Sequence, residues 1–319
     1  MTRFAIQRLA EAVAALIVIS FLVFGLAELV PGDIAEQIAG LEVGQAGKGV
    51  EQELDEFRER LGLNRPFVVR WGEWLVKAAT GDFGTSLITG REIAPDVVAA
   101  FPVSLELTIV SLLIALLIGI PLGVYAAAHF GGIADRLRGI SLIFLSIPTF
   151  VTGVVAVLLA SRYFPALYTS QYVRISKDLT ANLRAILLPS IVVALAITPM
   201  IAQMTRATMV ESLQEGYIVT ARAVGVHERR IRYVHALKAA LGPVVTLVGL
   251  LFGSLIGGLI VTEEIFNLPG LGRLVLNAVV RRDFQVAVAG TWVIAAVYVT
   301  VNLLVDLLYP VLDPRQRAG

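Results

Sequence analysis

A few polar side chains set into long apolar segments are the residues of this chain that could do chemistry. Glu106 stands at the start of one such segment, and Tyr298, Asn302 and Asp306 recur every four residues in another. That spacing places side chains on one face of a helix. Ionisable groups within a membrane are costly and usually face protein or a water-filled path. Glu106, Asn302 and Asp306 therefore predict either part of a solute path or a buried polar cluster.

Other kinds of site find little support in the residues. The chain has no cysteine and only three histidines, which argues against disulfides, thiolate metal sites and a His-rich metal centre. Residues 44–49 are Gly-rich and contain Lys48, but they lack the first Gly at the right spacing and a Ser or Thr after the Lys. We interpret them as a turn. We expect no catalytic residue, no metal and no cofactor on this chain.

The composition requires a membrane. Hydrophobic residues make up 57% of the 319 residues, charged residues only 16%, and the mean hydropathy is +0.80. Soluble domains carry about 25% charged residues. These values exclude a soluble enzyme and a disordered chain. With 26 Lys and Arg against 25 Asp and Glu, the chain also lacks the basic field of a nucleic-acid-binding protein.

Six apolar segments are long enough to cross a bilayer as helices, which requires roughly 20 residues each. We therefore predict an all-α, polytopic membrane protein with six transmembrane helices. A signal peptide is an alternative for the first segment, but no small-x-small cleavage site follows it. The predicted spans are 9–30, 107–128, 139–161, 185–205, 239–262 and 284–305.

Loop charges predict the orientation, because Lys and Arg favour the cytoplasmic side. With both termini inside, the cytoplasmic pieces carry 12 Lys and Arg, and the outer pieces carry 7 once the long loop is set aside. Loops above about 60 residues cross regardless of charge. The chain then divides into an N-terminal helix (1–30), an extracytoplasmic loop region (31–102) and a five-helix core (103–319) with a cytoplasmic loop at 206–238.

Two stripes of small residues run along predicted helices at four-residue spacing. One consists of Gly249, Gly253 and Gly257, and the other runs from Ala115 to Ala127 through Gly119 and Gly123. Small residues let helix backbones approach closely in a membrane. The stripes predict either an interface that slides or ordinary helix packing.

The cytoplasmic loop 206–238 is expected to fold as helix, break, helix. Gly216 and Gly225 are the expected breaks, and they enclose a helix of about two turns.

The residues of this loop resemble the coupling loop of ABC importer permeases. Within that family the loop looks like that of the first permease of the dipeptide, oligopeptide and nickel branch. Lys238 and Val224 depart from the pattern, and the departure at Val224 could alter the contact with an ATPase. The matching residues are Glu215, Tyr217, Thr220, Ala221, Arg222, Ala223 and Gly225, followed by His235, Ala236, Leu237 and Pro243.

The resemblance extends over almost the whole chain, although residues 162–184 match no motif of the family. The further similar pieces, in order, are 31–33, 61–66, 81–86, 146–148, 262–272, 282–284, 302–309 and 313–315.

The resemblance implies a non-catalytic permease subunit in a prokaryotic inner membrane. Its partners would be a second homologous permease, two ATPase subunits that bind ATP and Mg²⁺, and an extracytoplasmic substrate-binding protein. The helix from Gly216 to Ala223 would dock on an ATPase, with Tyr217 as anchor and Arg222 as an oriented charge, and Ala221 and Ala223 would permit close approach. Peptides are the solutes expected first, and nickel chelates or other small solutes are the alternatives. A six-helix channel or secondary transporter is the alternative.

Overall fold

The computed structural model describes residues 2–29, 59, 64–86, 88–129, 143, 146–165 and 171–312. Within these ranges the regular elements are helices, and the β-type pairing is one isolated bridge between Thr85 and Glu92. This confirms the all-α prediction. The stretch 44–49, most of 31–66 and the piece 313–315 lie outside the described residues.

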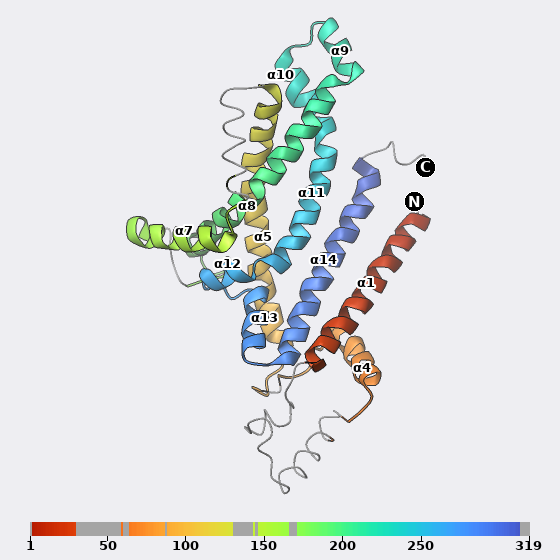
Figure 1. Cartoon of the computed structure of the whole chain (residues 1–319), viewed down its shortest axis with the longest axis vertical. Helices are drawn as coiled ribbons and strands as arrows, with labels where there is room; N and C mark the ends of the chain where they lie inside the picture. Colours follow the sequence, from red (N-terminus) through yellow and green to blue (C-terminus); the bar gives the residue numbers. More distant parts are fainter. Residues whose placement is uncertain are drawn as a thin grey trace.

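Five long apolar helices form the body of the molecule. At 1.5 Å per residue, the 28 residues of α1 span about 42 Å, more than the roughly 30 Å of a bilayer core. The helices run alongside one another, with α5 against α8, and α11 and α1 both against α14 (Figure 1). They are α1 (Thr2–Leu29), α5 (Ala94–Ala128), α8 (Leu179–Gln214), α11 (Leu237–Gly258) and α14 (Phe284–Leu312).

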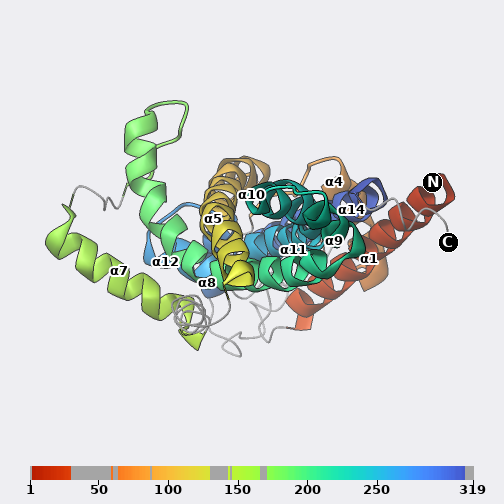
Figure 2. The same cartoon turned by 90° about the horizontal axis from the view of Figure 1, so that it is seen from above.

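The predicted third span differs from its expectation. The apolar run 139–161 is interrupted by a bend at Ile147 and by Pro148, and α7 (Thr149–Tyr163) begins only after them. Proline restricts the residue before it to extended conformations, which explains the break. With 15 residues α7 is shorter than a full span, and most of residues 139–145 lie outside the described ranges. It projects away from the long helices (Figures 1 and 2).

Short helices collect at the two ends of the long ones. At one end lie α4 (Phe67–Ala79) and α13 (Leu271–Val280), and the six-residue α12 (Ile260–Ile265) connects α11 to α13. At the other end lie α9 (Gly216–Ala223), α10 (Glu228–Arg230) and the π-helix η2 (Ile231–Ala236). The first residues of α1 and the last of α14 point toward this α9 end (Figure 1).

The small-residue stripes are contact lines between helices. A Cβ built on Gly253 would lie 2.9 Å from the ring of Tyr298, and one on Gly249 would collide with Val305 of α14. A Cβ on Gly123 would lie 2.6 Å from the carbonyl oxygen of Ala202 in α8. The stripes therefore pack α11 on α14 and α5 on α8.

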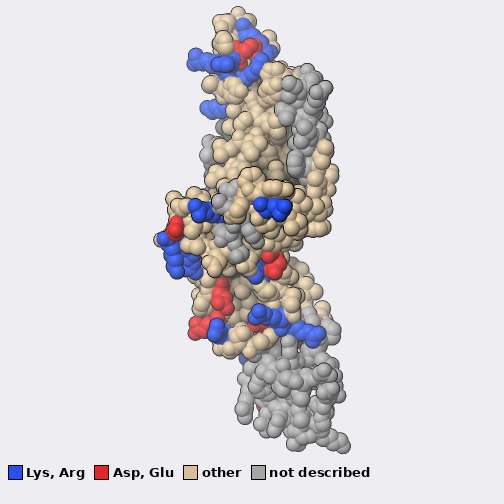
Figure 3. Space-filling model, turned by 90° about the vertical axis from the view of Figure 1, so that its left-hand side faces the viewer, with Lys and Arg blue, Asp and Glu red and all other residues tan. Residues whose placement is uncertain are grey.

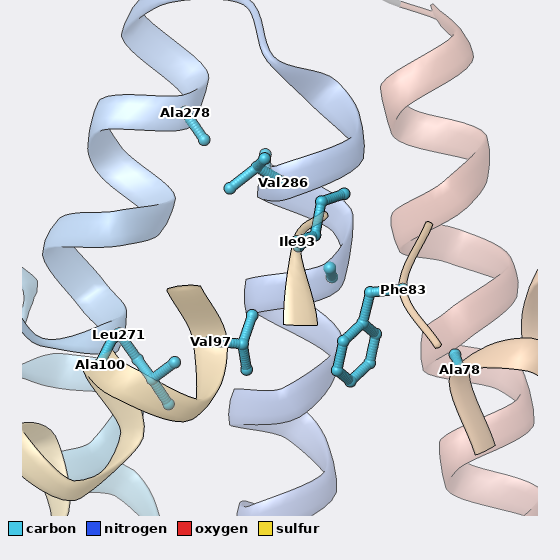
Figure 4. Packing of buried hydrophobic residues seen from close by; sticks show 10 residues of the cluster. Ala78, Phe83, Ile93, Val97, Ala100, Leu271, Ala278 and Val286 are labelled. Carbon is cyan, nitrogen blue, oxygen red and sulfur yellow. The ribbon is translucent and has the colours of Figure 1, made fainter. Parts of the chain in front are cut away.

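The end opposite α9 has its own hydrophobic core. Phe83, from the segment between α4 and α5, packs there with Ile93 and Val97 (Figure 4). In the same segment Ser86 Oγ donates to Asp283 Oδ2 at 2.5 Å, and both side chains are buried. The pieces 81–86 and 282–284, each noted separately in the sequence, thus meet in space.

Candidate functional site

The helix α9 begins where the chain leaves α8. Glu215 is extended (ψ 145°), which ends α8, and its carbonyl oxygen accepts the N–H of Ile218 at 2.9 Å to start α9. Gly216, expected as a break, is instead the first residue of the new helix. The break belongs to Glu215.

The end of α9 is a helix stop built on glycine. Gly225 has φ +80°, a left-handed conformation that glycine adopts without steric cost. Its N–H donates to Arg222 O, and the N–H of Val226 donates to Ala221 O, both at 3.0 Å. This pair of bonds is the Schellman motif. Gly225 is confirmed as the residue that ends the helix, and α9 is fixed in length at eight residues.

The side chain of Ile218 packs α9 against the membrane helices. Ile218 is 0% exposed and lies in a cluster with Val124 of α5, Met209 of α8, and Ile231 of η2. Full burial of an aliphatic side chain contributes roughly 1.5–3 kcal/mol. The cluster therefore packs α9 against α5, α8 and η2.

The other side of α9 is exposed. Tyr217 and Val224 are exposed large hydrophobic residues, and Val219 is 59% exposed. Thr220 and Ala223 are also exposed, whereas Ala221 is half-buried against the Ile218 cluster. Of the two alanines expected to permit close approach of a partner, the structure leaves Ala223 on the open side.

Arg222 is oriented by its own chain. Its Nε donates to Glu228 Oε1 at 2.8 Å, and the two side chains are each roughly half exposed. Arg232 lies 3.8 Å from the other oxygen of Glu228. The pair ties the exposed face of α9 to the start of α10. On the face shown in Figure 3, charged groups gather at the α9 end, and the described residues next to them are mostly uncharged.

Glu106 lies on α5 and meets a residue of the loop that matched no motif. Tyr172 Oη donates to Glu106 Oε2 at 2.6 Å. Burial, and then this hydrogen bond, raise the pKa of Tyr172, so its phenol stays protonated and remains a donor. Glu106 is half-buried, and its Oε2 accepts this hydrogen bond.

Asn302 and Asp306 lie one turn apart on α14 but have different surroundings. Asp306 Oδ2 is 3.5 Å from Arg8 Nη1 of α1, an ion pair between the first and last helices. Asn302 Oδ1 is buried and has no hydrogen-bond partner among the described residues. The structure does not bring Glu106 together with this pair, because Glu106 belongs to the half of α5 farther from α9.

A buried polar cluster lies at the end opposite α9, and no periodic pattern in the sequence predicts it. Ser104 Oγ donates to Glu263 Oε1 at 2.6 Å and accepts the N–H of Leu271 at 2.8 Å. Glu263 Oε2 accepts the N–H of Arg273 at 2.9 Å. The first turn of α13 is thus capped by two side chains from other elements. A Cβ on Gly270 would collide with the Glu263 carboxylate, so only glycine fits there.

Five helices long and apolar enough to cross a bilayer, among the described residues, indicate a multi-pass membrane protein. The chain belongs to the family described as binding-protein-dependent transport system inner membrane component, whose model matches residues 119–318. The model for the N-terminal part of such components matches residues 1–108. The protein is therefore a multi-pass inner-membrane component of an ABC transporter, with a role in transport.

Relatives of similar length match almost end to end. A probable peptide ABC transporter permease protein of Sinorhizobium fredii is 34% identical over 98% of both chains. A putative peptide transport system permease protein of Brucella abortus and the glutathione transport system permease protein GsiC of Escherichia coli K12 are each 35% identical over 99% of both chains.

Proposed function

We propose that this chain is the permease subunit of an ATP-driven importer for di- or oligopeptides. It would form the solute path with a second homologous permease and would be driven by two ATP-binding cassette ATPase subunits, which bind ATP and Mg²⁺. A substrate-binding protein would deliver solute to the end opposite α9. The relatives, two peptide permeases and a glutathione permease by name, support a peptide-like solute.

We further propose six spans with both termini in the cytoplasm. The five long helices supply five of them, and the segment that contains α7 supplies the sixth. The positions of the α1 start and the α14 end on the α9 side support this arrangement (Figure 1).

The coupling proposal rests on α9 having one buried side and one exposed side. Its inner side is held by Ile218 in the cluster with α5, α8 and η2, and its outer side presents Tyr217 and Val219. Tyr217 and the nearby Arg222 are of residue types enriched at the centre of protein interfaces. A partner bound to the exposed side of α9 would move the adjoining ends of α5 and α8 together with α9.

Transport then follows from two arrangements of the helix bundle. A ligand shifts such an equilibrium only by binding one arrangement more tightly than the other. Closure of the ATPases on ATP would supply that difference through α9. The α11–α14 and α5–α8 pairs, which approach closely at their glycines, would each move as a unit.

The test is peptide uptake into proteoliposomes that contain the complete transporter. We expect uptake that requires ATP and stops when Arg222→Glu places a like charge beside Glu228 on the docking side. Arg229→Glu, which changes charge by the same amount on the exposed α10, is the matched control. Uptake that continues without ATP would favour the channel or secondary transporter.

A further inference from the structure

The helix α4 has three distinct faces, and one of them is apolar and exposed. Its sequence, Phe67–Ala79, places residues three and four apart on common faces. The first face packs on the protein, the second carries charge, and the third carries exposed valines.

The protein face consists of Phe67, Trp71, Trp74 and Ala78. The Phe67 and Trp71 rings pack edge-to-face on Phe21 of α1, with centroids 5.2 and 5.3 Å away. Trp71 Nε1 also donates to Ser20 Oγ at 3.1 Å. This face fixes α4 along the last third of α1.

The charged face consists of Arg70, Glu73 and Lys77. Arg70 pairs with Glu28 near the end of α1, and Glu73 is held by Arg65 at 2.7 Å. Each of these pairs leaves at least one partner substantially exposed, which is the setting of groups in contact with water.

The third face consists of Val68, Gly72, Val76 and Ala79, with Val69 and Leu75 at its borders. Val68 is 61% exposed and Val76 is 69% exposed, and a Cβ on Gly72 would meet open space. Such an exposed apolar stripe is not expected on a side of a helix that contacts water.

Apolar side chains are also exposed on α1 beside α4. Leu22, Leu26 and Leu29 are exposed on the part of α1 that α4 accompanies. In the 18-residue apolar stretch that makes α1 a candidate membrane span, 6% of the residues are buried within the chain, so in a membrane its other side chains contact lipid or a partner helix. Tryptophan is enriched where membrane meets water, and α4 carries Trp71 and Trp74.

We propose that α4 is an interfacial helix that lies in the bilayer leaflet farther from α9. Its valine face contacts acyl chains, and its charged face contacts headgroups and water. Amphipathic helices of this type bury their apolar face about 5–10 Å into the headgroup–acyl boundary. Through Trp74, whose ring lies 6.1 Å from that of Trp292, α4 also connects this anchor to α14. The proposal is independent of how transport is powered.

Single cysteines test the proposal, because the chain has none of its own. Val68→Cys and Val76→Cys probe the apolar face, and Glu73→Cys and Lys77→Cys on the same helix are matched controls. Each variant is spin-labelled in the complete transporter and, separately, as the full chain alone, in phospholipid nanodiscs. The unsubstituted chain gives the background. Collision rates are measured with oxygen, which concentrates in lipid, and with a nickel chelate, which stays in water.

We expect the ratio of oxygen to nickel collisions to be severalfold higher at 68 and 76 than at 73 and 77, in both preparations. Equal ratios at all four sites would place the valine face in water and overturn the proposal. Low collision rates with both reagents at 68 and 76 in the complete transporter, but not in the chain alone, would show that a protein partner covers the face. That result would also overturn it.

Discussion

Ser104 and Glu263 are hydrogen-bonded at 2.6 Å although 159 residues separate them. Both side chains are 0% exposed, and together they accept the N–H groups that open α13. Buried polar groups require such partners, because each one left unpaired costs about 1–3 kcal/mol. The pair therefore holds α12 and α13 against α5 at the end where solute would enter or leave.

Glu263→Gln is expected to destabilise the protein by about 1–3 kcal/mol, because an amide NH₂ would face a donor where the carboxylate accepts. The measurement is thermal unfolding in detergent, together with uptake. Glu264→Gln is the matched control, because Glu264 is exposed and pairs with Arg273 at the surface, where an ion pair contributes about 0–1 kcal/mol. Equal effects of the two variants would contradict the role of Glu263.

Ile218→Ala is expected to loosen α9 at a cost of about 2–5 kcal/mol to the local packing. The measurement is hydrogen exchange of the α9 amides, with co-purification of ATPase as a second readout. Val219→Ala, one residue along and exposed, should leave the exchange rates close to those of the unsubstituted chain. Unchanged exchange in Ile218→Ala would mean that other contacts hold the helix.

Gly225→Ala is expected to strain the end of α9 by about 1–2 kcal/mol, because φ +80° is unfavourable for a residue with a Cβ. Uptake should fall, since the docking side is no longer held in one orientation. Gly216→Ala provides the comparison: a Cβ there meets open space, and Gly216 does not have a left-handed φ. If both variants transport equally well, the helix stop is not required.

Glu106→Gln and Tyr172→Phe separate two roles of one hydrogen bond. If the Glu106 charge touches solute, Glu106→Gln lowers uptake, whereas Tyr172→Phe, which leaves the carboxylate in place, has a smaller effect. We expect this order. The measurement is uptake rate as a function of solute concentration. Matching losses in the two variants would instead assign Glu106 to holding the loop before α8.

Local pattern was enough to predict much of this fold. Apolar runs located the five long helices, and the stretch from Glu215 to Gly225 located α9 to within one residue, because helix ends depend on neighbouring residues. Pro148 was visible in the sequence, yet the hydropathy of 139–161 hid the interruption there.

What local pattern could not predict is the pairing of distant residues. Ser86 meets Asp283 across 197 positions, and Ser104 meets Glu263 across 159. Such pairs depend on how helices pack and leave no periodic signal. The pieces 81–86, 262–272 and 282–284 contain the polar residues of these pairs. The family resemblance includes these pieces, but it does not indicate which of their residues make contact.

We propose above that an ATPase subunit docks on α9. The most direct measurement places a photoreactive amino acid at Val219 on α9 and, as control, at Val280 at the other end of the molecule, in the complete transporter. Both side chains are exposed. We predict a covalent adduct with an ATP-binding subunit from position 219 and none from position 280. A transporter that takes up solute normally but gives no adduct from position 219 would contradict docking of the ATPase subunit on α9.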